Sequence, residues 1–395
     1  MEKERSRVTR VMYFSDAPYF GGAERYLELL ISGLNREAYE PCVLTTGGAR
    51  LRDFRERLAK AGVAVFEISL SGPYDVPGYI EIVRIVRKWK PDLLHINLPG
   101  TYDAQASLVA PVAKLGRRVS VVTTEHLAMV EGTWKRHCAK RFSDLFVRAV
   151  VSITRSNVEF LSGTHRVPLS RIVVIHNGVD IAELDKAASS HVRSDLGLDA
   201  STFVFATVGS LVERKGHRYL LDAFAELCVS GHRRSALLIV GEGGEETSLK
   251  RKCSELGLAG KVFFLGHRED VQSIMRDVDC LVVPSTVEGM PFVILEAMVA
   301  SKSVIASRIH GIPEVIVEGE TGFLVPPRNV DSLYEAMRRV LENPALSRQM
   351  GAAGRRRIEA YFSHERMARE IECVYDVVLS GGKLPGPRTL CGSGP

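Results

Sequence analysis

The sequence lacks several features that would mark a membrane, secreted or metal-binding protein. No stretch approaches the roughly 18 consecutive apolar residues that a membrane-spanning helix needs, and no apolar signal region follows the charged segment 1–7. The seven cysteines form no C-x-x-C pair, so neither a disulfide framework nor a zinc site is expected. These absences predict a cytoplasmic protein with reduced thiols.

Nucleic-acid binding is not expected either. The net charge of +5 is small for 395 residues, and no DNA- or RNA-binding motif accompanies it. Hydrophobic residues make up 45% of the chain and charged residues 25%, which is ordinary for globular proteins. The length is enough for about two or three domains, each with its own core.

Short β-rich runs alternate with helix-length segments along the chain. The expected strands are 8–15, 41–46, 63–68, 92–97, 119–124, 150–154, 172–175, 202–208, 236–240, 262–265 and 280–283. This alternation predicts α/β architecture with parallel, doubly wound sheets. Ligands of such sheets bind at the carboxyl ends of the strands.

The most informative of these strand ends is 284–296. A Gly-containing turn after Pro284 carries Glu288, Pro291 is expected at the first helical position, and Glu296 lies inside the helix. Backbone N–H groups around 289–293 would face an anion, and the two carboxylates would accept hydrogen bonds from sugar hydroxyls. A loop glutamate and a surface glutamate without function are the alternative that the spacing alone leaves open.

Two further strand ends carry candidate residues in the first half of the chain. Gly21 and Gly22 lie between the first strand and a helix, where they would let the backbone approach a phosphate or a sugar, unless they form a plain tight turn. His126 follows the fifth strand, where a ligand-binding histidine and a capping or core histidine are both possible.

Two basic segments complete the set of candidates. Arg214 and Lys215 lie between a strand and an amphipathic helix, where they could reach an anion or remain surface charges. In the helix within 132–148, Trp134 and Phe142 share a face opposite basic residues that include Lys140. Such a helix could contact an anionic membrane or a phosphorylated acceptor, or pack on the core with its basic face in solvent.

Several of these motifs resemble one family. The frame Pro-Ser-Thr-x-Glu-Gly-Met-Pro-x-x-x-x-Glu-Ala-Met at 284–298 resembles the Glu-x7-Glu motif of the retaining glycosyltransferases of family 4, which have the GT-B fold. The segment 21–24 resembles the family's Gly-Gly-x-Glu loop, and 209–216 its Gly-Arg-x-x-x-x-Lys-Gly phosphate clamp. Ser210 stands where the family has arginine, so Arg214 is a hypothetical substitute.

The resemblance spans nearly the whole chain and implies two Rossmann-like domains facing each other across a catalytic cleft. The expected acceptor domain is 1–182, followed by a linker at 183–200 and a nucleotide-sugar domain at 201–362. A helix at 363–380 is expected to cross back to the first domain. A disordered tail is expected at 381–395.

The resemblance also implies residue roles. The expected catalytic residues are His126, Glu288, Lys215 and Arg214. The expected donor-binding residues are Gly21, Gly22, Gly209, Gly241, His267, Gly289, Met290, Pro291, Phe292 and Glu296. No Asp-x-Asp element ends a strand, so neither an essential metal nor another cofactor is expected.

The implied activity is transfer of a hexosyl group from a nucleotide diphosphate sugar to a glycan or lipid-linked saccharide, with retention. The setting would be cell-surface polysaccharide biosynthesis at the inner face of the membrane, with peripheral contact to anionic lipid. Two alternatives remain open: a GT-B-shaped subunit that binds a sugar nucleotide or a partner without catalysis, and another GT-B enzyme such as an epimerase or a phosphorylase.

Overall fold

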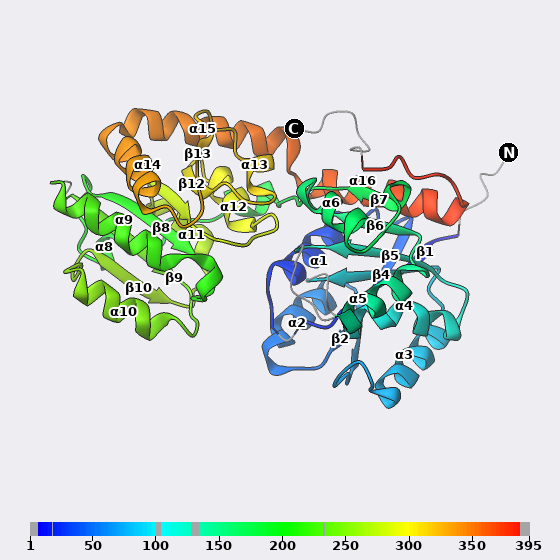
Figure 1. The fold of residues 1–395 in the computed structure, drawn as a ribbon. Coiled ribbons are helices and arrows are strands. Elements are labelled where there is room, and N and C mark those ends of the chain that lie inside the picture. Colours follow the sequence, from blue (N-terminus) through cyan, green and yellow to red (C-terminus); the bar gives the residue numbers. More distant parts are fainter. Residues whose placement is uncertain (1–6, 18, 100–103, 128–133, 232–233, 388–395) are drawn as a thin grey trace. The chain divides into compact units, whose positions relative to one another are not determined.

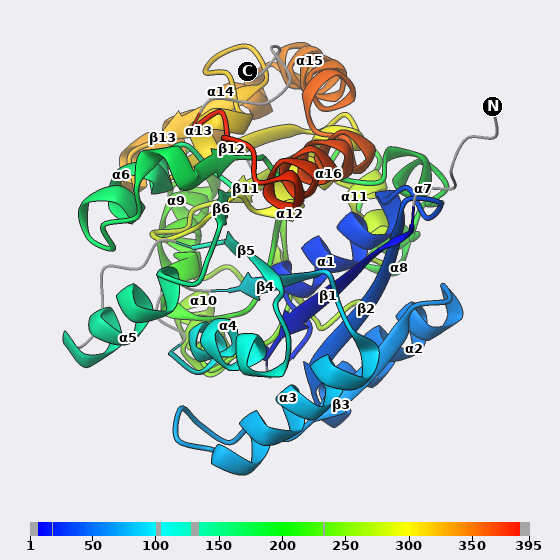
Figure 2. The ribbon, with the colours of Figure 1, turned by 90° about the vertical axis from the view of Figure 1, so that its right-hand side faces the viewer.

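The chain folds into two compact units, seen as ribbons in the computed structural model of Figures 1 and 2. The structure describes residues 7–17, 19–99, 104–127, 134–231 and 234–387. The first unit comprises 1–178 and 364–394, and the second comprises 179–363. Most of the tail expected at 381–395 lies outside the described residues, and no described helix has the length and apolarity to cross a bilayer.

The first unit contains a parallel seven-stranded sheet in the order β3-β2-β1-β4-β5-β6-β7. Its strands are β1 (Thr9–Ser15), β2 (Tyr39–Thr46), β3 (Ala64–Ile68), β4 (Leu93–Leu98), β5 (Ser120–Glu125), β6 (Ala149–Ser152) and β7 (Ile172–Val174). Its helices are α1 (Gly22–Gly33), α2 (Arg52–Lys60), α3 (Val76–Trp89), α4 (Ala104–Gly116), α5 (Trp134–Asp144), α6 (Ser156–Gly163) and α16 (His364–Ser380), with short 3₁₀ turns at Ala49–Leu51 and Leu169–Arg171.

Apolar side chains cover both faces of this sheet, as expected for parallel strands between helices. Met12 and Phe14 of β1 belong to a core shared with α3 and α4, whereas the intervening Tyr13 meets Tyr375 of α16. Figures 1 and 2 show α1 and α16 side by side. The last helix therefore belongs to the core of the first unit.

The second unit contains a parallel six-stranded sheet in the order β10-β9-β8-β11-β12-β13. Its strands are β8 (Phe203–Val208), β9 (Ser235–Val240), β10 (Val262–Gly266), β11 (Cys280–Val283), β12 (Ser303–Ser307) and β13 (Gly322–Val325). Its helices are α7 (Ile181–Asp185), α8 (Val192–Asp195), α9 (His217–Val229), α10 (Glu246–Glu255), α11 (Val271–Asp277), α12 (Phe292–Val299), α13 (Ile312–Val315), α14 (Val330–Glu342) and α15 (Pro344–Tyr361), with a 3₁₀ turn, η3, at Glu213–Lys215.

The direction of winding reverses between β8 and β11, which are neighbours in this sheet. Right-handed crossovers then place α9 and α10 on one face and α12 on the other. Phe205 of β8, Phe224 of α9 and Met337 of α14 lie in the core of the first of these faces. The reversal is the position where doubly wound sheets bind ligands.

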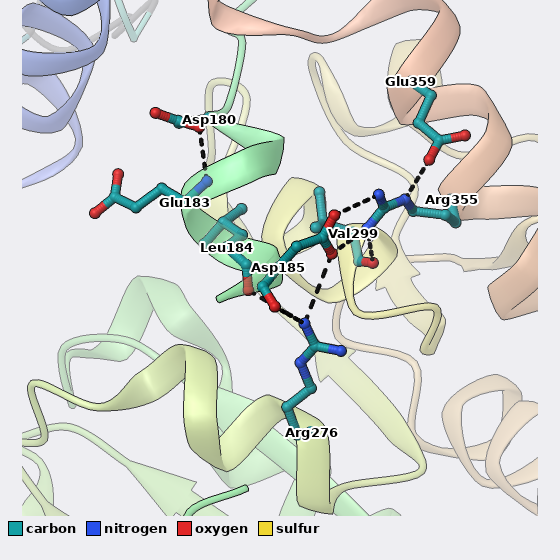
Figure 3. A network of polar contacts seen from close by, with 8 residues as sticks. All are labelled: Asp180, Glu183, Leu184, Asp185, Arg276, Val299, Arg355 and Glu359. Atoms are coloured by element: carbon teal, nitrogen blue, oxygen red, sulfur yellow. Dashed lines mark hydrogen bonds and ion pairs between the residues drawn. The ribbon is translucent and has the colours of Figure 1, made fainter. Parts of the chain in front are cut away.

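The segment 183–200, which the sequence predicts to be a linker, is folded against the second unit. Asp180 caps α7 by accepting a hydrogen bond from the N–H of Glu183 at 2.8 Å. Figure 3 shows Asp185 between Arg355 and Arg276, with both terminal nitrogens of Arg355 at 2.7 Å from its carboxylate. Arg355 holds the pKa of Asp185 below its usual range. Composition cannot reveal such contacts, since they join residues far apart in sequence.

Candidate functional site

The loops after β8 and β11 bring three of the expected catalytic residues together. Lys215 Nζ lies 2.6 Å from Oε1 of Glu288. The hydroxyl of Ser285 donates to the same oxygen at 2.9 Å. Glu288 is buried, whereas the Lys215 side chain keeps 17% of its exposure. A cation and a carboxylate thus stand in contact where the winding of the sheet reverses.

Backbone contacts hold these two loops against each other. The N–H of Thr286 donates to the carbonyl of Arg214 at 2.7 Å. Gly216 has a φ of +70°, and a Cβ there would lie 2.1 Å from the carbonyl oxygen of Pro284. Only glycine fits this combination of left-handed backbone and close approach. The backbone next to Lys215 is therefore restricted in conformation, and it carries the lysine to its contact with Glu288.

Arg214 takes a looser position than Lys215. Its guanidinium is 3.9 Å from Oε2 of Glu288 and donates to the carbonyl of Val287 at 3.4 Å, and its side chain is 44% exposed. Ser210 is exposed, and its carbonyl contacts Nε2 of His217 at 3.3 Å. Arg214 lies beside the ion pair, as a substitute for an arginine at position 210 would require.

The start of α12 differs by one residue from the prediction. Pro291 is the N-cap, with φ −72° and ψ 126°, and Phe292 is the first helical residue. Proline suits both positions because neither requires its missing N–H. Gly289 and the buried Met290 precede this cap, and Glu296 lies half-buried within α12. The prediction that places Glu288 on the loop and Glu296 inside the helix is confirmed.

The remaining donor-side candidates lie at the neighbouring ends of β8, β9 and β10. Gly209 donates its N–H to Val240 at 2.9 Å, and Gly241 donates to Gly266 at 2.8 Å. A Cβ at Gly241 would lie 2.1 Å from the carbonyl oxygen of Gly209. His267 is exposed just beyond β10. These residues extend one continuous sheet edge away from Lys215 and Glu288.

In the first unit the winding reverses between β1 and β4, and polar residues gather at those strand ends as well. Gly21 is the N-cap of α1, and Gly22 is its first residue. Glu24 accepts hydrogen bonds from the Gly21 N–H at 3.0 Å and the Ser15 hydroxyl at 2.8 Å. Burial raises the pKa of Glu24, and the bond from Ser15 partly offsets this. The buried carboxylate of Glu24 therefore holds the Gly21–Gly22 turn in place.

His126 follows β5 and is 8% exposed. Its Nε2 lies 2.6 Å from Oδ1 of Asn97, which belongs to β4, and its ring meets the ring of Tyr26 edge-on at 4.7 Å between centroids. Burial lowers the pKa of His126 to about 3, so the imidazole is neutral near pH 7. This histidine has the hydrogen bonding of a core residue and the strand-end position of a ligand-binding one.

A buried hydrogen-bond network extends from β5 to α16. His95 bridges Tyr375 and Thr124, with its Nδ1 2.5 Å from the tyrosine hydroxyl and its Nε2 2.7 Å from the threonine hydroxyl. Tyr26 contacts the same Thr124 hydroxyl at 3.2 Å. Burial lowers the pKa of His95 to about 3. The last helix thus supports β5, the strand that precedes His126.

For the basic helix, the alternative of a core-packed helix with its basic face in solvent is wrong. Trp134 and Phe142, together with Leu145 in the turn after α5, are 71%, 51% and 72% exposed. Lys140, which the helical pattern groups with the basic residues of the opposite face, is buried, with its Nζ 2.9 Å from Oε1 of Glu125. The carboxylate at the end of β5 draws the lysine inward, because a buried charge needs a partner. Apolar residues of α5 and of the turn that follows it face solvent instead.

Sequence reasoning assigned no role to Ser285, Glu24 or Asn97, which orient residues that it did find. Glu24 could have been recognised, since a glutamate at the third position of a helix often bonds back to the N-cap N–H. Asn97 offered no local signal. Its importance depends on strands far apart in sequence.

Two family models match this chain. The model described as "Glycosyltransferase Family 4" matches residues 20–183, and the one described as "Glycosyl transferases group 1" matches residues 190–357. The matches follow one another along most of the chain. The first lies in the first unit except for its last residues, and the second lies within the second unit.

The names of two curated relatives refer to the attachment or transfer of a sugar. The chain is 24% identical over 315 residues to N-acetyl-alpha-D-glucosaminyl L-malate synthase of Bacillus anthracis, which covers 79% of this chain and 81% of that protein. It is 26% identical over 363 residues to UDP-Gal:alpha-D-GlcNAc-diphosphoundecaprenol alpha-1,3-galactosyltransferase of Escherichia coli, with coverage of 88% and 91%.

Solved structures share the fold. Alr3699/HepE of Anabaena, crystallised with UDP and glucose, aligns with a TM-score of 0.81 at 22% identity, over 93% of this chain and 99% of that one. Sucrose-phosphate synthase of Thermosynechococcus elongatus aligns with a TM-score of 0.79 at 20% identity, over 95% and 100%. This chain therefore shares the fold of these two proteins, with its two Rossmann-like sheets.

Proposed function

This chain belongs to the family 4, group 1 glycosyltransferases, has the GT-B fold and is a hexosyltransferase; from that premise we propose that it uses a nucleotide diphosphate sugar and retains the anomeric configuration. The contact between Lys215 and Glu288 carries this proposal. It sets a cation for the diphosphate beside a carboxylate for sugar hydroxyls.

The proposed chemistry depends on departure of the nucleotide diphosphate. The bond between the anomeric carbon and the phosphate oxygen breaks as negative charge builds on that oxygen. Lys215, Arg214 and the backbone amides of 289–292 neutralise this charge. The acceptor hydroxyl attacks the same face of the sugar and passes its proton to the departing phosphate oxygen. A new glycosidic bond forms with retention.

The other candidate residues position the donor. Glu288 accepts hydrogen bonds from sugar hydroxyls, and Glu296 accepts them from the ribose. His126 orients the sugar, and Gly21 and Gly22 let the backbone approach the diphosphate. The base and the phosphates of the donor are proposed to contact three residues at the ends of β8, β9 and β10, which are Gly209, Gly241 and His267.

The similar proteins support a nucleotide-sugar donor and a glycan or lipid-linked acceptor. The Anabaena structure holds UDP, and the name of the E. coli relative specifies UDP-galactose and a diphosphoundecaprenol acceptor. We assign this chain the same classes of substrate without choosing the base, the sugar or the acceptor. A role in building cell-surface polysaccharide is part of the proposal.

We also propose that α5 contacts the anionic inner face of the membrane. Trp134, Phe142 and Leu145 are exposed apolar side chains, and Arg141 is exposed nearby. An aromatic and a cationic group at one surface suit the headgroup region of a bilayer. Co-sedimentation with vesicles containing anionic lipid, compared between the parent and Trp134→Ser/Phe142→Ser, tests this. Equal binding of the two proteins would refute it.

No essential metal is part of the proposed mechanism, because Lys215 and Arg214 supply the positive charge at the diphosphate. Full transfer activity in the presence of EDTA is therefore expected. A loss that Mg²⁺ or Mn²⁺ restores would show that the cationic side chains do not suffice.

The decisive test is a thermal-shift panel of nucleotide diphosphates and their sugars on the parent and on Glu296→Ala. A ligand at a hundredfold excess over its dissociation constant stabilises the native state by about 2.7 kcal/mol. One nucleotide should shift the parent and not the variant. Glu255→Ala is the matched control, since Glu255 is an exposed glutamate of the same unit. If no nucleotide shifted the melting temperature of the parent, the proposed donor site would be refuted.

Activity with the donor then separates catalysis from binding. The anomeric configuration of the new glycoside, read by NMR, tests retention. Donor binding without transfer to any acceptor would favour the binding subunit, for which Ser210 is the one specific observation. Conversion of the donor without a new glycoside would favour an epimerase.

A further inference from the structure

Asn97 connects the two candidate features of the first unit. Its side chain is fully buried at the end of β4. The amide nitrogen Nδ2 donates to the carbonyl of Ala23 in α1 at 2.9 Å. The amide oxygen Oδ1 lies 2.6 Å from Nε2 of His126. One side chain therefore contacts both the helix that begins at the Gly21–Gly22 turn and the histidine at the end of β5.

Chemistry permits only one orientation of this amide. The carbonyl of Ala23 can accept a hydrogen bond but cannot donate one, so the NH₂ group of Asn97 must face it. Oδ1 must then face His126, and it too can only accept. The Nε2 of His126 consequently carries a hydrogen and donates it.

The second ring nitrogen of His126 has the opposite character. Burial keeps the imidazole neutral, and a neutral imidazole carries a single N–H. The titratable groups that face it are Tyr26 on α1, whose pKa burial raises, and His95 on β4, which is also neutral near pH 7. Nδ1 therefore holds a lone pair. Among the described residues it has no hydrogen-bond partner.

We propose that Asn97 is a positioning residue that fixes His126 as its Nε2–H tautomer, so that Nδ1 accepts a hydrogen bond from a hydroxyl of the donor sugar. The sugar part of this inference rests on the proposed function. In this role His126 accepts a hydrogen bond and transfers no proton. By holding Ala23 as well, Asn97 keeps the glycine turn and the histidine in one fixed geometry.

The tautomer can be measured without any substrate. Protein labelled with ¹⁵N-histidine is examined at pH 7 by long-range ¹H–¹⁵N correlation, and the His126 ring is assigned by its absence in His126→Gln. Nε2 should appear as the protonated nitrogen and Nδ1 as the unprotonated one. The opposite tautomer, or two protonated nitrogens, would overturn the inference. Because no donor takes part, this result is independent of the proposed transferase activity.

Kinetics then test the positioning role. Asn97→Leu removes both polar contacts at similar volume and should lower kcat about 10- to 100-fold, the order of loss from a misplaced group, with the donor KM changed less than about threefold. Because the part of the Asn97 effect that passes through His126 is lost with the ring, Asn97→Leu should lower kcat by a smaller factor in the His126→Gln background than in the parent. Additive losses would overturn the role.

Controls separate positioning from general damage. Asn157→Ala removes another buried asparagine of the first unit, on α6, and should leave kcat unchanged. The NMR spectrum of Asn97→Leu should show the two His126 tautomers in exchange. A single unchanged Nε2–H tautomer in that variant would show that Asn97 does not fix the ring. If Asn97→Leu fails to fold, the parent spectrum still decides the tautomer.

Discussion

The two units place different chemistry at equivalent points of their sheets. Where the second unit reverses its winding, a lysine and a glutamate form an ion pair that keeps some contact with solvent. Where the first unit reverses, neutral and mostly buried groups form hydrogen bonds, among them His126, Asn97 and His95. At equivalent points of its sheet, the second unit thus presents a partly exposed ion pair, whereas the first unit presents mainly neutral hydrogen-bonding groups and keeps Glu24, Glu125 and Lys140 buried.

This difference has a physical basis. The attraction of a charge for an anion depends weakly on direction, so a partly exposed lysine on a rigid turn can serve it. A hydrogen bond between neutral groups depends strongly on angle, so the partners must be held by packing. Under the proposed function, the second unit would neutralise the charged leaving group and the first would orient the neutral sugar.

The sharpest test of the ion pair in the second unit is Lys215→Ala. Loss of a preorganised charge at the leaving group should lower kcat by about 10²- to 10³-fold. Steady-state kinetics at saturating acceptor measure this. Lys250→Ala, which removes an exposed lysine paired with Glu246 in the same unit, should change kcat less than about twofold. A loss below tenfold for Lys215→Ala would break the comparison.

The buried hydrogen-bond network of the first unit is tested through the free energy of unfolding. Tyr375→Phe deprives the buried His95 and Tyr13 of a hydrogen-bond partner. At about 1–3 kcal/mol for each unpaired buried group, the free energy of unfolding should fall by about 3 kcal/mol. Urea unfolding measures the loss. Tyr74→Phe is the control, since that side chain is almost fully exposed, and should change stability by less than about 0.5 kcal/mol.

A third test uses the pKa of His126, which is about 3 in the folded chain and about 6.5 when unfolded. As pH falls below 6.5 the unfolded state binds the proton first, so the contribution of the neutral histidine to stability is present above pH 6.5 and lost below it. The stability of the parent relative to His126→Gln should fall by about 2 kcal/mol between pH 7.5 and pH 5.

Thr45→Val provides the control for this measurement. Thr45 is buried in the same unit and does not titrate, so the difference between parent and Thr45→Val should stay constant over that pH range. A constant difference for His126→Gln as well would mean that His126 is not held neutral.

The smallest effect is expected for Arg214→Ala. The guanidinium is half-exposed and 3.9 Å from Glu288, so solvent screens it more than Lys215. The loss in kcat should be about fivefold and should shrink as salt is added. A loss as large as that of Lys215→Ala would make Arg214 an equal member of the phosphate clamp.

Local sequence signals were enough to predict the fold and the loops that carry the charged residues. Short β-rich runs identified strands β1 to β11, and the segment 280–283 coincides with β11. The same signals assigned Glu288 to a loop and Glu296 to a helix. Local signals suffice there because the backbone conformations of glycine and proline are set by their own covalent structure.

Contacts between distant segments were beyond such signals. Helical periodicity grouped Lys140 with the other basic residues of one face and gave no sign of its burial, because its partner Glu125 lies on β5, fifteen positions earlier. Asn97 gains its role only when α1, β4 and β5 are packed together. The hydrogen-bonded groups of the first unit depend on such contacts. They were therefore less predictable from the sequence than the loops of the second unit that carry the ion pair.

The place of α16 also bears on how the protein is made. The second unit, 179–363, is complete in the growing chain before α16 is synthesised, whereas the first unit needs Tyr375 of that helix to satisfy His95. Domains usually fold on the ribosome in the order of their synthesis. Here the strands made first must wait for a helix made last. A nascent chain that stalls before residue 364 would carry a finished second unit and an unfinished first one, with Tyr13 and His95 uncovered for chaperones to bind.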